Sequence, residues 1–370
     1  MNDPYPASAD NITGRVTDGF AQWLAEFVGS LAVTTDQAGK VALIGWDGRQ
    51  PAIMLRHFDK PMGIAVDQDR PDDKPHGLGL VTRQSVMVLA NSPSQAAEYP
   101  RECPAGHDAL FLPRTCYWTS DLLIHDIAFA GDELWIVNTR FSCLATLSHR
   151  HSFVPRWQPP FISALTPEDR CHLNGLALDG GRARFVTALG RSDTAEGWRP
   201  TRTSGGVVID VESGQIVLDG LCMPHSPRWH DGMLWYLDSG RGHLCVVQPG
   251  ETRPTVVCGV LGYLRGLSFV GMHAVIGLSL IRESRTFGGL PIGESGEELH
   301  CGVAVVDLRT GRLTGIFDFT GGCEEIYDVR FLPGIRHPAI LNANDPLCSQ
   351  AITTPDFAYW MHSRTTAEME

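Results

Sequence analysis

The chain has 370 residues, of which 30 are basic and 42 acidic, so its formal net charge at pH 7 is −12. This acidic balance argues against electrostatic binding of nucleic acids or of anionic membranes, and it favours small molecules or proteins as partners. No apolar run reaches the roughly 18 residues of a membrane-spanning helix, and the first residues lack the pattern of a signal peptide, so we expect a cytoplasmic protein.

A short amphipathic helix is predicted over residues 18–28, where apolar residues recur at helical spacing: Phe20, Trp23, Leu24, Phe27 and Val28. Thr17 or Asp18 can cap its first turn. We expect this helix to cover one face or the outer edge of the main domain, and a dimer contact is the alternative. Residues 1–29 are therefore assigned to an N-terminal segment.

The main feature of the sequence is a repeat of short strands. Its six copies are PMGIAV from Pro61, HDIAF from His125, HLNGLAL from His172, PHSPRW from Pro224, RGLSFV from Arg265 and EIYDVRF from Glu325. Each copy leads into a second apolar strand, and successive copies lie between 40 and 63 residues apart. Because a four-stranded propeller blade takes roughly 40 to 50 residues, the repeat predicts an all-β, six-bladed β-propeller with insertions.

The two ends of the domain are expected to share one blade. Three strands precede the first copy, in SLAVTT from Ser30, KVALIG from Lys40 and PAIMLRHF from Pro51, and EIYDVRF can supply their missing innermost partner. Such a shared blade closes the ring and leaves no open sheet edge. PAILNA, from Pro338, competes with SLAVTT for the second-strand position, so seven blades are the alternative. The propeller is assigned to residues 30–345 and a C-terminal tail to 346–370.

Long segments interrupt the repeat at residues 91–117, 190–206 and 282–300. They exceed what a blade requires, so binding loops and plain insertions remain two equal interpretations. The first strand of each blade lines the central channel, and polar residues are frequent there. They are His125, Asp126, His172, Asn174, His225, Arg265, Glu325 and Asp328.

Three of these channel residues are histidines near the starts of consecutive inner strands: His125, His172 and His225. Neutral imidazoles that approach from separate blades are suitable ligands for one divalent ion, and zinc, iron, copper or nickel would fit them better than calcium. The histidines do not share one register, because His125 and His172 lie one and two residues before the polar residue used to align the copies. The alternative is that these side chains satisfy buried backbone groups and channel water.

The predicted function is that of a metal-dependent enzyme acting on a small, polar, anionic substrate by hydrolysis or elimination. Glu325 or Asp328 would be the general base, Arg265 would orient the substrate, and Asp126 is a further catalytic candidate. Metal-dependent oxygen chemistry is one alternative. A binding scaffold without chemistry, with a protein partner on its rim loops, is the other.

Two resemblances add to this interpretation. The HDIAF, NGLAL, MPHSPRW and DSG segments, spread between Ser30 and Leu341, resemble those of an uncharacterised bacterial six-bladed propeller family without a known activity. Asn-Gly-Leu-Ala at residues 174–177 resembles an inner strand of the gluconolactonase-type propellers, which hold a divalent ion with Glu, Asn and Asp and open lactones. This second resemblance implies Asn174 as a metal ligand, whereas the three histidines depart from that family's oxygen-rich site.

Overall fold

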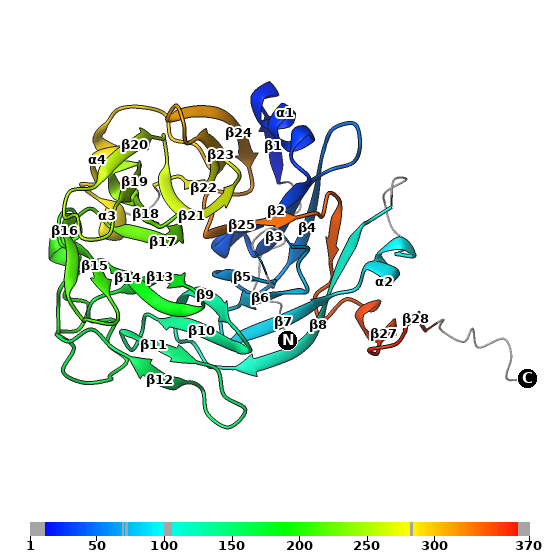
Figure 1. Cartoon of the computed structure of the whole chain (residues 1–370), viewed down its shortest axis with the longest axis horizontal. Coiled ribbons are helices and arrows are strands. Elements are labelled where there is room, and N and C mark those ends of the chain that lie inside the picture. Colours follow the sequence, from blue (N-terminus) through cyan, green and yellow to red (C-terminus); the bar gives the residue numbers. More distant parts are fainter. Residues whose placement is uncertain (1–11, 69, 71–72, 100–105, 282–283, 362–370) are drawn as a thin grey trace, which may run out of the picture.

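The computed structural model describes residues 12–68, 70, 73–99, 106–281 and 284–361. Six sheets stand around a central axis, each with one strand at the centre and its last strands toward the rim (Figure 1). The inner strands of neighbouring sheets contact one another all the way around the ring. The protein is therefore a six-bladed β-propeller, as the repeat predicts.

Five blades begin with one of the first five copies of the repeat, and their strands follow one another outward in chain order. Blade 2 contains β5 (Ile64–Asp67), β6 (Gly77–Val81), β7 (Ser85–Asn91) and β8 (Ala109–Trp118). Blade 3 contains β9 (Ile124–Ala130), β10 (Glu133–Asn138), β11 (Cys143–Thr146) and β12 (Val154–Trp157). Blade 4 contains β13 (Leu173–Asp179), β14 (Arg182–Ala188), β15 (Gly206–Asp210) and β16 (Ile216–Leu221). Blade 5 contains β17 (Pro224–His230), β18 (Met233–Asp238), β19 (His243–Val247) and β20 (Thr255–Gly259). Blade 6 contains β21 (Tyr263–Val270), β22 (His273–Ser279), β23 (Gly302–Asp307) and β24 (Arg312–Gly321).

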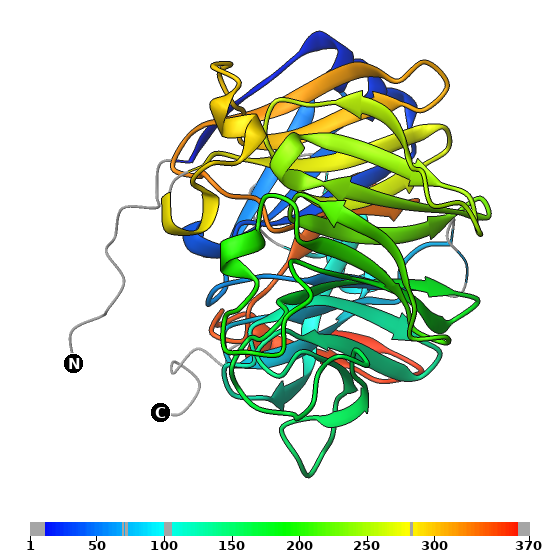
Figure 2. The same cartoon turned by 90° about the vertical axis from the view of Figure 1, so that its left-hand side faces the viewer.

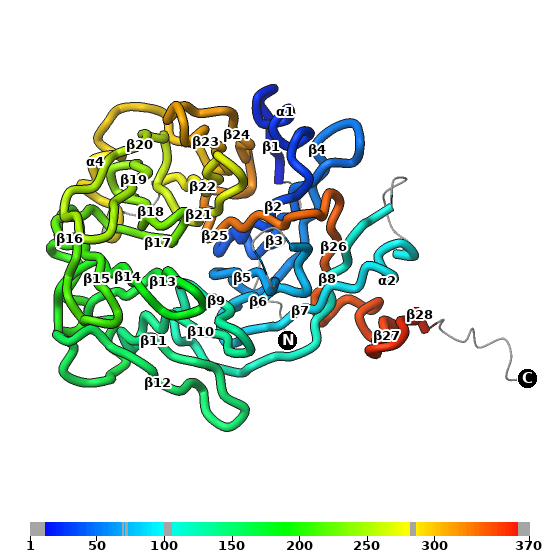
Figure 3. Tube along the Cα trace, viewed as in Figure 1, coloured from blue at the N-terminus to red at the C-terminus, as the bar shows by residue number. Residues whose placement is uncertain are grey.

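Blade 1 joins the two ends of the propeller. Its order is β25-β2-β3-β4, and its strands are β25 (Asp328–Pro333), β2 (Gly29–Thr34), β3 (Lys40–Trp46) and β4 (Pro51–His57). β2 pairs with β25 in one unbroken antiparallel register, from Gly29 opposite Pro333 to Thr34 opposite Asp328. Figure 3 shows the orange β25 beside the blue β2 at the centre of the ring. The predicted closure by strands from both ends is confirmed.

The seven-blade alternative is wrong, because the PAILNA segment does not belong to the closing blade. Its strand, β26 (Pro338–Ile340), pairs in parallel with β8 at the outer edge of blade 2. After β25 the chain turns at Gly334, where φ is 71°, and continues into the neighbouring blade. The second-strand position of blade 1 is held by β2, all six residues of which are buried.

The predicted N-terminal helix is present as α1 (Asp18–Glu26), and Thr17 caps it by accepting from the Phe20 amide over 3.4 Å. Phe20, Trp23 and Leu24 are buried against blades 1 and 6. The helix lies directly on β24, where a Cβ atom at Gly315 would meet the Phe20 nitrogen at 2.1 Å. Just ahead of it, β1 (Thr13–Val16) pairs with β24 as a fifth strand of blade 6.

The remaining elements are short and lie between or outside the blades. The helices are α2 (Pro93–Ala97), α3 (Ser284–Phe287) and α4 (Pro291–Glu294), with single 3₁₀ turns η1 (Asp36–Ala38), η2 (Arg199–Thr201), η3 (Ser239–Arg241) and η4 (Cys348–Gln350). A hairpin of β27 (Ala351–Thr353) and β28 (Ala358–Trp360) packs beside α2. In the described part of the chain, no helix has the length and apolar character that crossing a membrane requires.

Candidate functional site

The starts of the inner strands surround a cavity of about 280 Å³ at one mouth of the channel. We call it the histidine cavity, because His125 and His172 line it together with Arg265, Glu325 and Tyr327. Behind it, deeper in the channel, lies an inner cavity of about 10 Å³ that shares His125, Arg265 and Tyr327 and adds His225. All three predicted histidines therefore face one continuous region of the channel.

His125 and His225 occupy equivalent positions in blades 3 and 5. The residue two positions earlier has a left-handed backbone in both blades, with φ of 50° at Leu123 and 51° at Met223. The carbonyl of that residue accepts a hydrogen bond from the imidazole Nδ1–H over 2.8 Å in each case. Because a carbonyl can only accept, the proton is assigned to Nδ1, and Nε2 keeps its lone pair.

Burial keeps both of these histidines uncharged. Loss of solvent lowers the pKa of His125 well below its usual value of 6.5, and the neighbouring His172 lowers it further. Loss of solvent, followed by the charge of Arg265, lowers the pKa of His225 in the same way. Both rings are therefore neutral near pH 7, and each can offer Nε2 as a base or as a ligand.

His172 lies immediately before β13, two positions earlier than the other two histidines lie in their strands, whereas the register of the sequence predicts an offset of one. The difference arises from a bulge between Leu173 and Gly175. His172 takes the left-handed position itself, with φ of 52°, and Asp169, at the start of the same short turn, has φ of 48°. This turn brings the Asp169 carboxylate to 2.8 Å and 3.0 Å from Nδ1 of His172.

Trp198 donates its indole N–H to the Asp169 carboxylate over 3.2 Å. Its ring also packs against the imidazole of His172, with the two ring centres 4.5 Å apart. The ring centre of His172 lies 4.6 Å from that of His125.

Arg265 and Glu325, two of the predicted catalytic residues, form an ion pair. The guanidinium carbon lies 5.3 Å from the ring centre of Tyr263 and 5.0 Å from that of Tyr327. Burial raises the pKa of Tyr327 well above its usual value, so this phenol stays protonated near pH 7. The ion pair and the two rings fix Arg265 between the histidine cavity and the inner cavity.

Two of the three long loops form one wall of the histidine cavity. They connect β14 with β15 and β22 with β23, and they lie on the same face of the propeller (Figure 2). The Arg202 guanidinium joins them by donating twice to the Gly288 carbonyl, over 2.6 Å and 3.1 Å. Trp198 from one loop and Phe287 from the other line the cavity. These loops therefore narrow the mouth of the channel.

Asp126 and Asp328 lie deeper in the channel and are paired with arginines. Arg228 approaches Asp126 to 2.8 Å, and Arg330 lies 3.0 Å from both aspartates. The Asp126 carboxylate also accepts from the Leu176 amide over 3.1 Å. We call these two aspartates and two arginines the ion-pair cluster. Three of its members, Arg330 being the exception, line the inner cavity on the side away from the histidine cavity.

Asn174 lies between blades 4 and 5, with both ends of its amide engaged. The amide nitrogen donates to the Pro224 carbonyl over 3.0 Å, and the amide oxygen accepts from the Thr187 hydroxyl over 2.6 Å. The side chain lines the inner cavity. It is thus close to His225, but its hydrogen bonds link two blades.

The donor set for a metal is only partly assembled. Each of the three histidines has its Nδ1 held by an acceptor, as metal-binding histidines commonly do, so each could present Nε2 to an ion. His125 and His172 lie together, whereas His225 belongs to the inner cavity. Within the described ranges, no group of three or more His, Cys, Asp or Glu residues is placed to hold a metal ion.

The inner cavity has room for about one water molecule. Four buried polar atoms of its lining residues have no hydrogen-bond partner among the described residues: His225 Nε2, Arg265 Nε, Tyr327 Oη and Arg228 Nη2. The first three are an acceptor, a donor and a hydroxyl that can do either, so a single water could satisfy these three.

We therefore expect a high-resolution crystal structure to show one ordered water within hydrogen-bond distance of these three atoms. His225→Phe should expel that water because the larger ring removes its acceptor and its space. Tyr327→Phe is the matched control, since it keeps the acceptor and Arg265, and should retain the water. An inner cavity without a water peak in the unaltered protein would contradict this prediction.

Sequence reasoning identified the histidines but missed two residues that shape the site. Asp169 precedes His172 by three positions in EDRCHLN, and that spacing was the available signal. Trp198 was visible only as an aromatic residue in a long loop. Both residues contact His172 because of the tight turn before β13. The left-handed residues of this turn, Asp169 and His172, are not glycines, so the sequence does not indicate the turn.

Comparisons with known proteins place the chain in a family without giving it an activity. No curated protein matches the chain. Among solved structures, a chain from the crystal structure of a nidogen/laminin complex is similar at a TM-score of 0.49 and 11% sequence identity, over 83% of this chain and 99% of that one. A family model described as a domain of unknown function (DUF4915) matches residues 18–341. The protein therefore belongs to the DUF4915 family.

Proposed function

We propose that this protein is an enzyme that performs general-base chemistry on a small, polar, anionic substrate in the histidine cavity. The observation that carries the proposal is the Asp169–His172 pair, 2.8 Å apart, with His172 lining the cavity. A carboxylate on Nδ1 orients the ring and stabilises the imidazolium that forms when Nε2 takes a proton. His172 is thus the proposed base, in place of Glu325 or Asp328, which are held in ion pairs.

The composition of the cavity limits the reaction. No serine or cysteine is among its described lining residues, and the hydroxyl of its threonine, Thr286, accepts a hydrogen bond from Arg199 over 3.4 Å. We therefore assign His172 to act on a water molecule or on an acidic C–H bond of the substrate. These two cases correspond to hydrolysis and to elimination. Tyr327, held protonated by burial, can donate a proton to the leaving group or to an oxyanion.

The charge and size of the cavity limit the substrate. Among the described lining residues, Lys60, Arg199 and Arg265 stand against two carboxylates, Asp36 and Glu325, and this excess of positive charge favours an anion. A volume of about 280 Å³ suits a compact metabolite-sized molecule. Small carboxylate-bearing esters, lactones and β-substituted acids are therefore the substrates to test.

The test is a turnover screen with this panel, in which proton release or product formation is measured. Once a substrate is found, His172→Gln and Asp169→Asn should each lower kcat by roughly 10²-fold or more, as loss of a positioned base does. His151→Gln is the matched control, because His151 is exposed and lines neither the histidine cavity nor the inner cavity. Full activity in His172→Gln would refute the proposed base.

A divalent transition metal in the channel is the second candidate, and it rests on the three Nδ1 atoms that are held by acceptors. If bound, such an ion would polarise a substrate oxygen or lower the pKa of a bound water. His125 and His172 would supply the first two ligands. This second candidate predicts near-stoichiometric zinc, iron, copper or nickel by plasma mass spectrometry of protein purified without chelator. Metal retained by all three single variants of His125, His172 and His225 would argue against these ligands.

Lactone opening is one hydrolysis on the panel, in line with the likeness of residues 174–177 to gluconolactonase-type propellers. A calcium dependence would favour Asn174 and the channel carboxylates as ligands. A non-catalytic scaffold, with a protein bound on the rim loops, predicts instead that no panel substrate is turned over and that the histidine variants keep partner binding.

A further inference from the structure

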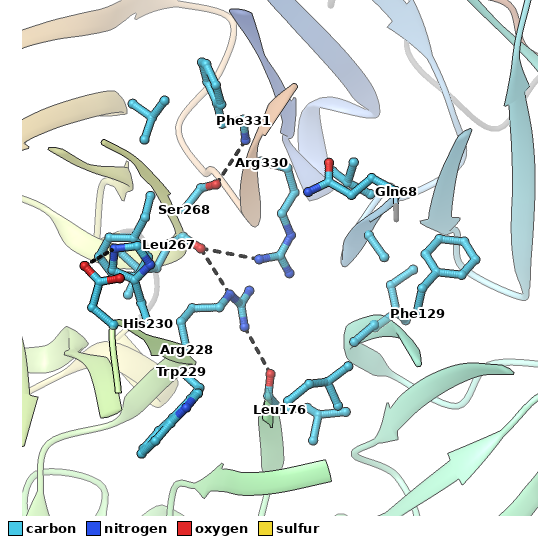
Figure 4. Close-up of a pocket in the computed structure, with 18 of the residues that line it drawn as sticks. Gln68, Phe129, Leu176, Arg228, Trp229, His230, Leu267, Ser268, Arg330 and Phe331 are labelled. Carbon is cyan, nitrogen blue, oxygen red and sulfur yellow. Dashed lines mark hydrogen bonds and ion pairs between the residues drawn. The ribbon is translucent and has the colours of Figure 1, made fainter. Parts of the chain in front are cut away.

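The channel has a second cavity at its opposite mouth, around the ends of the inner strands. It measures about 840 Å³, within the usual range of small-molecule sites, and all six inner strands contribute to it (Figure 4). We call it the arginine cavity, because Arg228 and Arg330 form its floor. None of the residues around the histidine cavity lines it.

The walls of the arginine cavity combine polar groups with four large aromatic side chains. Phe129, Trp229, Phe269 and Phe331 each come from a different blade, and each is only half-buried. The His230 ring stacks on Phe269 with centres 4.1 Å apart and planes 2° apart, which extends the flat surface. Such walls offer an apolar ligand a large contact area at little cost in side-chain entropy.

The floor presents positive charge to the cavity. Arg228 and Arg330 are joined by the Leu267 carbonyl, which accepts from them over 3.1 Å and 3.3 Å (Figure 4). Both side chains are 13–14% exposed, whereas their partners Asp126 and Asp328 are 5–6% exposed and do not line the cavity. The carboxylates thus lie behind the guanidinium groups, toward the inner cavity.

Nη2 of Arg228 donates to no acceptor within the described residues, but it is fully buried beside Asp328, 3.7 Å away, and does not open onto the arginine cavity. The floor therefore offers the exposed parts of the Arg228 and Arg330 side chains. Guanidinium groups bind carboxylates and similar oxyanions strongly when water is excluded, so this floor favours an anion.

We propose that the arginine cavity is a second binding site, for an organic anion with a bulky aromatic or aliphatic body. Its carboxylate or sulfonate contacts Arg228 and Arg330, and its body packs against Phe129, Trp229 and Phe269. The ion-pair cluster lies between this site and the histidine cavity, so ligand binding here is independent of the proposed catalysis.

The test uses two fluorescent probes that differ only in the anionic group. The full-length protein is titrated with 8-anilinonaphthalene-1-sulfonate and with N-phenyl-1-naphthylamine, which lacks the sulfonate. We expect one sulfonate probe to bind per chain, at least tenfold more tightly than the neutral probe. Equal affinities, or no binding of the sulfonate, would overturn the proposal.

Variants locate the bound probe. Gln68→Glu adds a negative charge to the cavity lining with little change in shape and should weaken the sulfonate at least threefold but not the neutral probe. Gln215→Glu, on the exposed outer part of blade 4, is the charge-matched control and should change neither. Phe129→Ala should weaken both probes, and circular dichroism checks that it is folded. Two outcomes would refute the site by placing the probe elsewhere. One is loss of sulfonate binding in His172→Gln, and the other is an unchanged sulfonate affinity in both Gln68→Glu and Phe129→Ala.

Discussion

Replacing Asp328 with alanine is expected to lower the free energy of unfolding by about 3–5 kcal/mol, because it leaves two buried arginines with one carboxylate. Arg330 loses a partner at 3.0 Å, and Arg228 loses one at 3.7 Å. The Ile64 and Val329 amides, which donate to the same carboxylate over 3.2 Å and 2.9 Å, also lose their acceptor. Urea denaturation followed by circular dichroism measures the effect.

Asp231→Asn is the control for this prediction, because asparagine tolerates the left-handed backbone of this residue, where φ is 50°. The Asp231 side chain is 70% exposed, and its only described ion pair is with His230 at 3.5 Å. An exposed pair of this kind contributes about 0–1 kcal/mol, so the control should unfold near the urea concentration of the unaltered protein. Equal stability of the Asp328 and Asp231 variants would show that the ion-pair cluster does not hold the inner strands together.

Acidification should destabilise the fold through the two buried histidines. His125 and His225 have a folded-state pKa well below 6.5, whereas the unfolded chain titrates near 6.5. Below that pH the unfolded state binds more protons than the folded state, so stability is lost as the pH falls from about 6.5 toward the folded pKa. The loss is at most about 1.4 kcal/mol per pH unit for each histidine.

This pH dependence is measured as the difference between unfolding free energies at pH 7.5 and pH 5.5. His225→Gln removes one titrating ring and keeps a polar side chain, so it should reduce the acid-induced loss by up to half. His149→Gln, at an exposed position, should leave that loss unchanged. An identical acid-induced loss in the protein with and without His225 would contradict the buried, neutral state of this ring.

The fold was largely readable from the sequence because each blade repeats the same pair of strands. The closing blade was readable too, since β2, β3 and β4 lacked an inner partner and the last copy lacked outer ones. β26 was not, because its three residues pair in parallel at an outer edge, where neither a turn nor an alternating pattern marks the partner.

The site was readable only in part. His125 and His225 share one offset from their strands, and this predicts their equivalence. The pairing of Asp169 with His172 depends on backbone angles that the sequence does not encode visibly. Arg330 was missed although it follows Asp328 by two positions, the spacing that places side chains on one face of a strand. Arg228 was missed because a bulge between His225 and Arg228 breaks this alternation in β17.

The pairing of β2 with β25 also sets the order in which the molecule can fold. The Asp328 amide donates to the Thr34 hydroxyl over 3.0 Å across 294 positions of the chain. During synthesis, β2 therefore emerges long before its partner, and blade 1 cannot form until residue 333 has been made. Contacts this distant in sequence slow folding, so ring closure is expected to be a late step in folding. Until then, the nascent propeller remains an open arc.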